Sequence, residues 1–215
     1  MNLVTVSVGR PREISWQDRV VRTSIFKTPV DGRVRVSRLN LDGDEQSDLL
    51  VHGGPDKAVY AYPVEHYAPW QTELALADLP HGSFGENLTV DGLIETEVAI
   101  GDEYRIGTAE FIVTQPRLPC FKLGIRFARS DIVKLFFDSG RTGFYLRVTR
   151  EGEIGAGDSI ERLTQDTKGL TIQRVFDLYS ANAAKPEDLK LASEHPALAA
   201  GWRKRFQKQL DQSET

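Results

Sequence analysis

Cysteine is almost absent from this chain, because its 215 residues include only one, Cys120. A lone cysteine cannot form an intramolecular disulfide, and a zinc or iron–sulfur site built from cysteine alone needs about four thiolates. Long apolar runs are also missing, since none approaches the roughly 20 residues that cross a bilayer. The first residues predict a strand and not a secretory signal. We therefore expect a cytoplasmic protein without a membrane span, in which any redox centre is borrowed.

An excess of positive charge is lacking as well. The formal net charge of −4 and the isoelectric point near 5.6 provide no basic field for nucleic acid or an anionic membrane. Hydrophobic residues make up 40% and charged residues 27%, which is ordinary for a globular protein that buries a core. At this length we expect one large domain, or one medium domain with a small appendage.

Most of the chain is predicted to be β-structure. Short runs alternate apolar and polar side chains and end at Gly-Asp or Asp-Gly turn signals. Two helical stretches interrupt them: 63–77, where Pro69 is expected to kink or reset the helix, and 130–137, with Ser130 as N-cap. Many short strands favour a closed or nearly closed β-barrel. The expected strands are 3–8, 33–41, 58–62, 104–106, 109–114 and 144–149.

The periodicity becomes helical after about residue 163. Apolar residues recur at helix-face spacing in three segments, which begin near Thr171, Pro186 and Pro196. The sequence therefore predicts a mostly β domain over 1–163 and a small three-helix domain over 164–215.

Cys120 lies in a stiff, cationic loop. Pro116 and Pro119 restrict the backbone before it, and Arg117 and Lys122 are positive neighbours, which favour a reactive thiolate. Free cysteines are also among the most buried residue types and often only fill space. From the local sequence, a packing role and a role as metal ligand or nucleophile both remain open.

A glycine pair, Gly53 and Gly54, stands before Lys57 and a predicted strand. Such a pair lets backbone amides approach a ligand and form an anion-binding concavity. Lys57 offers a point charge for phosphate, and His52 is able to bind a ligand or shuttle a proton. A tight surface loop explains the same residues, and the spacing of a P-loop is missing.

Two further clusters carry polar side chains between glycines. Glu86 and Asn87 are adjacent and offer the acceptors and donors that a heterocycle requires, although a structural turn explains them equally well. Arg141, flanked by glycines, suits a flexible anion clamp, whereas Arg147 in an alternating strand is typical of a barrel face. The segment 153–158 predicts a hairpin that closes the barrel.

Taken together, these clusters resemble the MOSC domain, which is named for the C-terminal part of molybdenum cofactor sulfurases. The tail is similar to the helical extension of the stand-alone bacterial YiiM-type branch. The resemblance covers nearly the whole chain and implies a MOSC-type β-barrel followed by a small three-helix domain. The motifs that carry it are, in order, His-Gly-Gly-Pro-Asp-Lys-Ala, Gly-x-Phe-Gly-Glu-Asn, Gln-Pro-Arg-x-Pro-Cys-x-Lys-Leu, Arg-x-Gly-Phe-Tyr-x-Arg-Val and Gly-x-Gly-Asp.

The resemblance implies that the chain binds the molybdenum cofactor, a pterin (molybdopterin) that carries molybdenum on a dithiolene. The role of metal ligand falls on Cys120, since soft thiolates suit such a site. The residues expected to contact the cofactor are Cys120, His52, Gly53, Gly54, Lys57, Glu86, Asn87, Arg117, Lys122 and Arg141.

The implied reaction is a reductive dehydroxylation that detoxifies N-hydroxylated bases. N-hydroxylated purines or amidoximes lose oxygen to the metal and become the amine or amidine, and His52 or Glu86 delivers protons beside Cys120. The chain has no Rossmann Gly-x-Gly-x-x-Gly and no iron–sulfur cysteines. A separate reductase of flavoprotein or ferredoxin type is therefore the expected electron donor, and a homodimer is expected from the resemblance.

Two other functions fit the sequence. The principal alternative is a non-catalytic carrier, which binds the cofactor or holds sulfur as a persulfide on Cys120. The other is a cysteine hydrolase in which His52 or His66 acts as base, although nothing resembles a nucleophile elbow.

Overall fold

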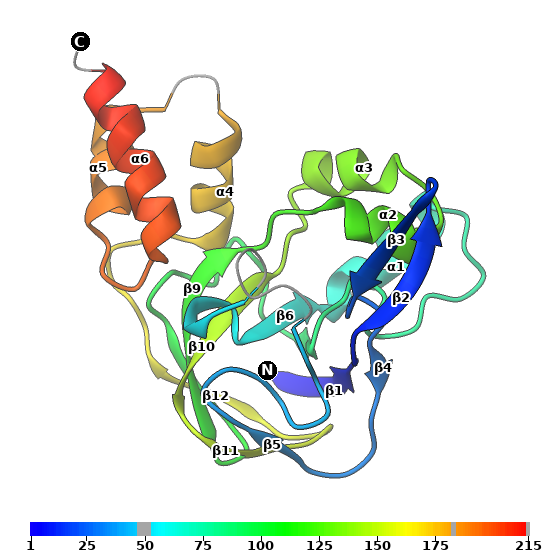
Figure 1. Cartoon of the computed structure of the whole chain (residues 1–215). Coiled ribbons are helices and arrows are strands. Elements are labelled where there is room, and N and C mark those ends of the chain that lie inside the picture. Colours follow the sequence, from blue (N-terminus) through cyan, green and yellow to red (C-terminus); the bar gives the residue numbers. More distant parts are fainter. Residues whose placement is uncertain (47–52, 182–183, 214–215) are drawn as a thin grey trace.

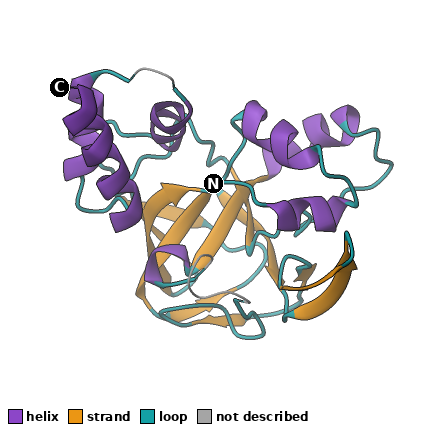
Figure 2. Ribbon diagram, turned by 45° about the horizontal axis from the view of Figure 1, so that its top comes forward, coloured by secondary structure: helices purple, strands orange, loops and turns teal. Residues whose placement is uncertain are grey.

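A curved sheet forms the centre of the molecule, and helices lie in two separate groups on it (Figures 1 and 2). The computed structural model describes residues 1–46, 53–181 and 184–213. Helices α1 to α3 form one group, and α4 to α6 form the other, near the C-terminus. In the part of the chain that the structure describes, no helix has the length and apolarity to cross a bilayer.

The main sheet has eight strands in the order β12-β8-β9-β10-β6-β7-β1-β4. Neighbouring strands are antiparallel except β6 and β7, which run parallel. Its strands are β1 (Asn2–Val8), β4 (Thr28–Pro29), β6 (Val59–Pro63), β7 (Leu88–Asp91), β8 (Glu103–Ile106), β9 (Ala109–Pro116), β10 (Phe144–Arg150) and β12 (Ile160–Thr164). Two separate pairs are β2 (Arg12–Trp16) with β3 (Arg19–Thr23), and β5 (Val34–Val36) with β11 (Gly152–Ile154).

The sheet curves until the segment before β12 reaches β1. The Leu3 amide donates to the Asp158 carbonyl at 2.9 Å, and the Gly157 amide donates to the Leu3 carbonyl at 2.8 Å. The expected mostly β, barrel-like domain with helices after it is thereby confirmed. The predicted hairpin over 153–158 is wrong, because β11 pairs with β5 while β12 pairs with β8.

The helices lie close to where periodicity places them, with three differences. The stretch 63–77 divides into a short 3₁₀ turn and α1, and Pro69 falls in the first turn of α1, where a helix needs no N–H donor. The N-cap of α3 is Asp131 and not Ser130, and α2 is an additional helix. The helical elements are η1 (Pro55–Lys57), η2 (Val64–His66), α1 (Tyr67–Glu73), α2 (Phe121–Phe127), α3 (Ile132–Ser139), α4 (Ile172–Ser180), α5 (Pro186–Glu194) and α6 (Ala200–Ser213).

One buried cluster joins the sheet to the C-terminal helices. Val113 and Leu146 of the sheet belong to the same apolar core as Ile172, Val175 and Phe206 of the helices. A second, aromatic core lies under α1 to α3. Because burial of apolar surface is the main favourable term in folding, this continuity fixes the three-helix domain against the sheet.

Candidate functional site

Cys120 lies where β9 ends and α2 begins. Strand β9 ends at Pro116, and after a short loop Cys120 is the N-cap of α2, with extended backbone (φ −129°). Its carbonyl accepts the Leu123 amide at 2.9 Å, which starts the helix. The thiol is free and half-buried. The loop therefore holds the sulfur in a fixed position that is still open to a ligand.

A cleft opens beside this thiol. Its walls come from the segment after β3, from η1, from strands β6 and β10 and from the Cys120 loop, so the site draws on distant parts of the sequence. Four of its side chains are cationic and two are carboxylates, which favours an anionic occupant. The described residues that line this cleft are Thr23, Ser24, Ile25, Lys27, Asp44, Glu45, Gln46, Lys57, Tyr60, Gly85, Asn87, Arg117, Leu118, Cys120, Lys122 and Tyr145.

Arg117 is a buried cation that lines the cleft. Its guanidinium lies 4.8 Å from the centre of the Tyr60 ring and donates to the Tyr60 hydroxyl at 3.3 Å. Burial works to lower the pKa of Arg117, but the oxygens of Tyr60 and Tyr145 and the Cys120 sulfur outweigh it and raise that pKa. Arg117 thus keeps a permanent charge close to the thiol.

Two tyrosines complete this part of the wall. The rings of Tyr60 and Tyr145 are 5.2 Å apart, and the Tyr60 hydroxyl donates to the Thr142 carbonyl at 2.8 Å. Burial raises the pKa of both phenols, and for Tyr145 the neighbouring Arg117 opposes the effect only in part. Both phenols therefore remain protonated near neutral pH and are able to donate a hydrogen bond.

Lys27 and Asp44 form a buried ion pair on another wall of the cleft. Their side chains are 9% and 2% exposed. The other Asp44 contacts are the Gly9 amide at 2.8 Å and the Asn87 side-chain amide at 2.9 Å. Burial lowers the pKa of Lys27, and the Asp44 carboxylate opposes that shift. The pair fixes the segment that precedes β4 against the sheet.

Ser24 provides a polar atom that the fold leaves without a partner. Its hydroxyl lines the cleft, is buried, and makes no hydrogen bond within the described chain. Buried polar groups in folded proteins nearly always have a partner, so an unsatisfied one in a cleft indicates a place for a polar ligand.

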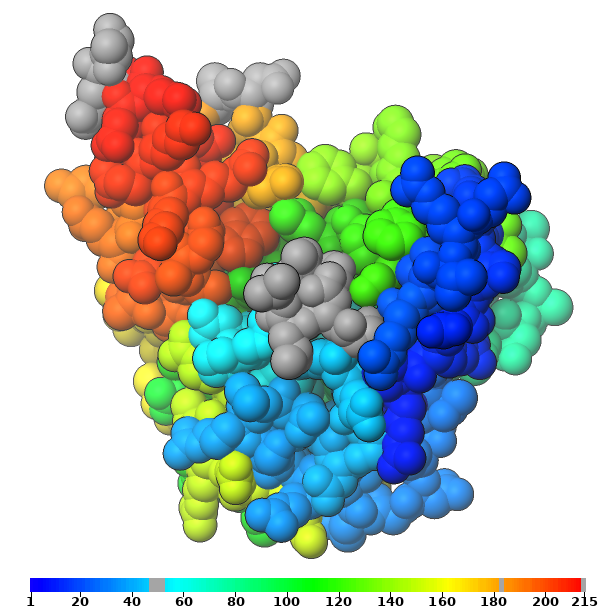
Figure 3. Space-filling model, viewed as in Figure 1, coloured from blue at the N-terminus to red at the C-terminus, as the bar shows by residue number. Residues whose placement is uncertain are grey.

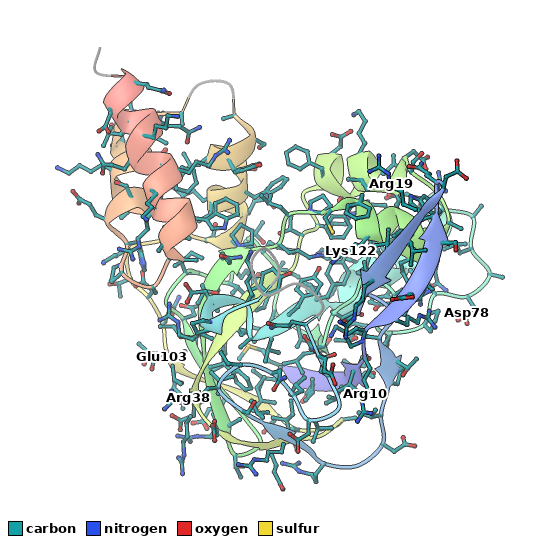
Figure 4. All side chains as sticks on the ribbon, viewed as in Figure 1. Arg10, Arg19, Arg38, Asp78, Glu103 and Lys122 are labelled. Carbon is teal, nitrogen blue, oxygen red and sulfur yellow. The ribbon has the colours of Figure 1, made fainter. Side chains whose placement is uncertain are left out.

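Of the residues predicted from sequence, five line the cleft together. They are Lys57, Asn87, Arg117, Cys120 and Lys122. Figure 4 shows Lys122 in the middle of the molecule, between the C-terminal helices and the β2–β3 hairpin. The Asn87 side chain also accepts the Tyr60 amide at 3.1 Å, so its orientation is fixed.

Glu86 lies behind the cleft and not on its wall. It is fully buried, and its carboxylate accepts the amides of Gly82 at 2.7 Å and Phe84 at 3.0 Å as well as the Tyr67 hydroxyl. Burial raises the pKa of Glu86, while these hydrogen bonds oppose the shift. The Glu86 carboxylate therefore holds the turn 82–86.

Arg141 is directed away from the cleft as well. Its guanidinium lies 3.9 Å from the centre of the Trp70 ring and pairs with Glu73 at 2.5 Å, and so it binds α1. Gly53 and Gly54 line a different hollow, next to α6. His52 lies outside the described residues.

The sequence did not single out Lys27, Asp44, Ser24, Tyr60 or Tyr145. The two tyrosines stand in or beside the quoted motifs, so their position was a usable signal. Lys27 and Asp44 belong to no motif, and only the fold brings them together.

His66 does not support the cysteine hydrolase. Its Nε2 lies 2.8 Å from Glu95 Oε2, and its ring packs against Tyr62. The hollows beside Cys120 include no histidine among their described residues. A base placed for nucleophilic attack is therefore missing from the part of the chain that the structure describes.

The described residues offer a metal ion alone no binding site of the usual kind. Across residues 1–46, 53–181 and 184–213, no group of three or more His, Cys, Asp or Glu side chains could hold one. Cys120 offers one soft ligand, so a metal bound there must bring its remaining ligands with it.

The chain matches two family models. Residues 48–161 match the MOSC domain, and residues 170–213 match the YiiM-like, 3-alpha helix domain.

Known proteins resemble the chain over most of its length. It is 38% identical over 210 residues to the uncharacterized protein YflK of Bacillus subtilis, which covers 98% of this chain and 95% of that protein. The crystal structure of YiiM from Geobacillus stearothermophilus superposes with a TM-score of 0.82 at 35% identity, covering 97% of this chain and 98% of that one. A protein of Gibberella moniliformis named "Reductase" is 36% identical over 182 residues, which are 81% of this chain but 32% of that protein.

Proposed function

Because this chain belongs to the MOSC domain family and carries the YiiM-like three-helix domain, we propose that it binds the molybdenum cofactor through Cys120 and reduces N-hydroxylated compounds. The family takes its name from molybdenum cofactor sulfurases, which supports an association with that cofactor. The observation that carries the proposal is the half-buried thiol in a cationic cleft, beside which the described residues form no metal site of their own.

The residues of the cleft fit the cofactor. Cys120 supplies a soft thiolate for molybdenum. The pterin carries a phosphate and a ring edge with donors and acceptors, for which Lys57 and Lys122 supply charge and the unpartnered Ser24 hydroxyl supplies a hydrogen bond. The permanent charge of Arg117 favours an anionic group near the thiol.

The proposed reaction breaks the N–O bond of the substrate. A hydroxylamine R–NH–OH takes up two electrons and two protons and yields R–NH₂ and water. When bound, the cofactor supplies the two-electron oxygen chemistry, while the protein supplies binding, orientation and protons. Tyr145 lines the cleft and the neighbouring hollow together with Cys120, and in this proposal its protonated phenol donates a hydrogen bond to the departing oxygen.

The electrons come from a second protein in this proposal. Cys120 is the only cysteine of the chain, so a cysteine-bound iron–sulfur cluster cannot form within it. We propose a flavoprotein or ferredoxin-type reductase as the donor. The Gibberella moniliformis protein named "Reductase", in which the matching part is about a third of the length, supports a reductive role.

Turnover by the loaded protein tests this function. The protein is purified from a host that makes the cofactor, reduced with dithionite and methyl viologen, and given an N-hydroxylated purine or an amidoxime. We expect the amine or amidine from the wild type and none from Cys120→Ala. A wild type that carries molybdenum and pterin but converts neither substrate would overturn the reductase and favour a carrier of cofactor or sulfur.

A further inference from the structure

The three-helix domain lines a groove that leads away from Cys120. Two adjoining hollows make up this interdomain groove, and they share Lys57, Gln115, Leu118 and Trp202. The hollow nearer the thiol also includes Cys120 and Tyr145. We propose that Trp202 and Gln115 form the wall that binds the planar ring of the substrate, so that the three-helix domain determines specificity. This inference rests on the proposed function.

Trp202 belongs to the same hollow as the thiol although the two are 82 positions apart in the sequence. The cationic cleft described above also includes Cys120 and Tyr145, and it has the polar lining that suits the cofactor. A substrate must reach the same metal from a direction that the cofactor leaves open. The interdomain groove offers such an approach, because it includes Cys120 and also Trp202 and Gln115, which do not line the cationic cleft.

The aromatic wall is rigid. Trp202 is 9% exposed, and its ring lies 5.2 Å from that of Tyr179 and 5.9 Å from that of Phe206. The Arg205 guanidinium lies 4.1 Å from the centre of the Tyr179 ring and also lines the groove. Aromatic rings held in this way offer a preformed surface to another flat ring.

Gln115 adds a polar side chain to the groove. The residue is 4% exposed and lines both hollows of the groove. One amide provides both a donor and an acceptor, and so it is able to pair with a ring nitrogen and an adjacent exocyclic N–H. In an aminopurine such an edge belongs to a flat ring that is able to stack on Trp202, whereas a small aliphatic amidoxime has no ring.

Backbone contacts hold the two walls together. The Ala199 amide at the start of α6 donates to the Thr114 carbonyl at 3.2 Å, directly beside Gln115. The Thr114 hydroxyl donates to the Asp56 carbonyl of η1 at 2.7 Å. Figure 3 shows the cyan surface near residue 55 lying against the orange and red surface of the C-terminal helices. The position of Trp202 relative to Gln115 is therefore set by the fold.

Substrate discrimination tests the inference. The probes are 6-N-hydroxylaminopurine, which has a flat ring system, and acetamidoxime, which has no ring. The variants are Trp202→Leu, which keeps an apolar filling, Trp202→Phe, which keeps a ring, and Gln115→Met, which keeps length without hydrogen bonds. Lys208→Ala, on the exposed side of α6, is the matched control. KM and kcat are measured for both substrates, and the dissociation constant of the purine is measured by calorimetry.

We expect Trp202→Leu and Gln115→Met each to raise KM and Kd for the purine about tenfold, in the range that one lost contact gives. The same variants should change the values for acetamidoxime by less than about twofold on that scale. Trp202→Phe should restore most of the purine affinity. Equal losses for both substrates, or no loss for the purine, would overturn the inference.

The measurements distinguish a failure of the proposed reductase function from a failure of the proposed Trp202–Gln115 wall. If the wild type binds the purine and the Trp202 and Gln115 variants weaken that binding, but nothing is turned over, the proposed function is wrong and the wall is supported. If the purine is reduced and neither residue affects its KM or Kd, the wall is wrong and the reductase is supported. A wild type that neither binds nor reduces the purine overturns both.

Discussion

At the scale of single residues, the site depends on how the fold arranges charge around one thiol. Arg117 is held by Tyr60 on one side and packs over Phe136 on the other, with its guanidinium 5.2 Å from the centre of that ring. Such packing fixes a charge at low cost in side-chain entropy, since a planar guanidinium stacks well on aromatic rings. Tyr145 belongs to the same cluster, and a substitution that removes its hydroxyl tests the role proposed for it.

Tyr145→Phe removes only that hydroxyl. If the phenol assists departure of the oxygen, kcat for an N-hydroxylated substrate falls about 10²-fold, as expected for a lost acid catalyst, while KM and molybdenum content stay nearly unchanged. Steady-state kinetics on the loaded protein measures this. A kcat within about twofold of the wild type contradicts the assignment, since that is far below the effect of an acid catalyst.

Asp44→Asn tests the buried ion pair. The substitution leaves the Lys27 charge buried without its counter-ion, and such a loss costs about 3–5 kcal/mol in the free energy of unfolding. Urea titration measures it. Asp138→Asn breaks the exposed pair with Lys134, whose side chains are 51% and 79% exposed, and should change stability by less than about 1 kcal/mol. Equal effects of the two substitutions would show that burial of the Lys27–Asp44 pair has no energetic consequence.

The sequence could supply only part of this site. Cys120, Arg117 and Lys122 lie within six positions, so a cationic thiol loop was predictable from local sequence. The partners of Arg117 and the pair Lys27–Asp44 come from segments that meet only in the folded sheet, and no local pattern encodes such contacts. Glu86 shows the opposite case. It stands in a motif and was predicted to contact the cofactor, but its carboxylate accepts a turn amide in the structure.

At the scale of elements, the loop before β10 is fixed by a glycine that has no space for a side chain. Gly143 has φ +61°, and a Cβ there would lie 2.5 Å from the Ala61 carbonyl oxygen. Its amide donates to Glu95 at 2.6 Å. The predicted flexible clamp around Arg141 is thus a tightly packed turn.

Gly143→Ala is therefore expected to destabilise the protein by about 3 kcal/mol or more, because the clash adds to backbone strain. Gly157→Ala is the control, since Gly157 has φ +89° but nothing within 4 Å of a Cβ. It should cost only the conformational strain of about 1–2 kcal/mol. Thermal unfolding measures the stability that each variant loses. Equal losses of stability would contradict the role given to packing at Gly143.

Alternation and turn signals predicted β6, β8, β9 and β10 closely. Burial alternates along all or part of β8, β9 and β10, whereas every residue of β6 is buried. The β2–β3 hairpin was missed. Its turn is formed by Gln17 and Asp18 with φ 48° and 60°, where such turns usually have Asn-Gly. Helix α2 was missed because its seven residues follow the thiol motif directly and are too few for a clear period.

At the scale of the whole molecule, the junction between the two parts contains a buried histidine. His195 is 1% exposed, and its Nε2 lies 3.3 Å from Asp166 Oδ2. Burial lowers the pKa of His195 below its usual 6.5, and Asp166 opposes the shift only partly. Between the lowered pKa and 6.5, the unfolded chain binds more protons than the folded one.

It follows that the contribution of His195 to stability is complete above pH 6.5 and is lost as the pH falls below that value. Glu86, with its raised pKa, acts in the opposite direction above pH 4.5, so the comparison must be made between variants. We expect His195→Gln to flatten the pH dependence of the free energy of unfolding below pH 6.5. Urea titrations at each pH measure it, and an unchanged slope would show that His195 does not titrate on unfolding.

The division of the chain into two domains was easier to predict than the way in which the helical domain packs beside Cys120. The change of period near residue 163 indicated a helical tail, and β12 ends at Thr164. That the tail shares a core with the sheet and lines a groove beside Cys120 depends on tertiary packing, which periodicity does not describe. For the same reason, the sequence indicated Trp202 only as one of several apolar residues on a helix face.

The molybdenum content of the purified protein tests the central claim most directly. The wild type and Cys120→Ala are produced in a host that makes the cofactor, and metal and pterin are measured per chain together with thermal stability. We predict about one molybdenum and one pterin per wild-type chain, consistent with one thiolate ligand per metal, and loss of molybdenum in a folded Cys120→Ala variant. A metal-free wild type, or equal molybdenum in both proteins, would contradict the role of Cys120 as the ligand.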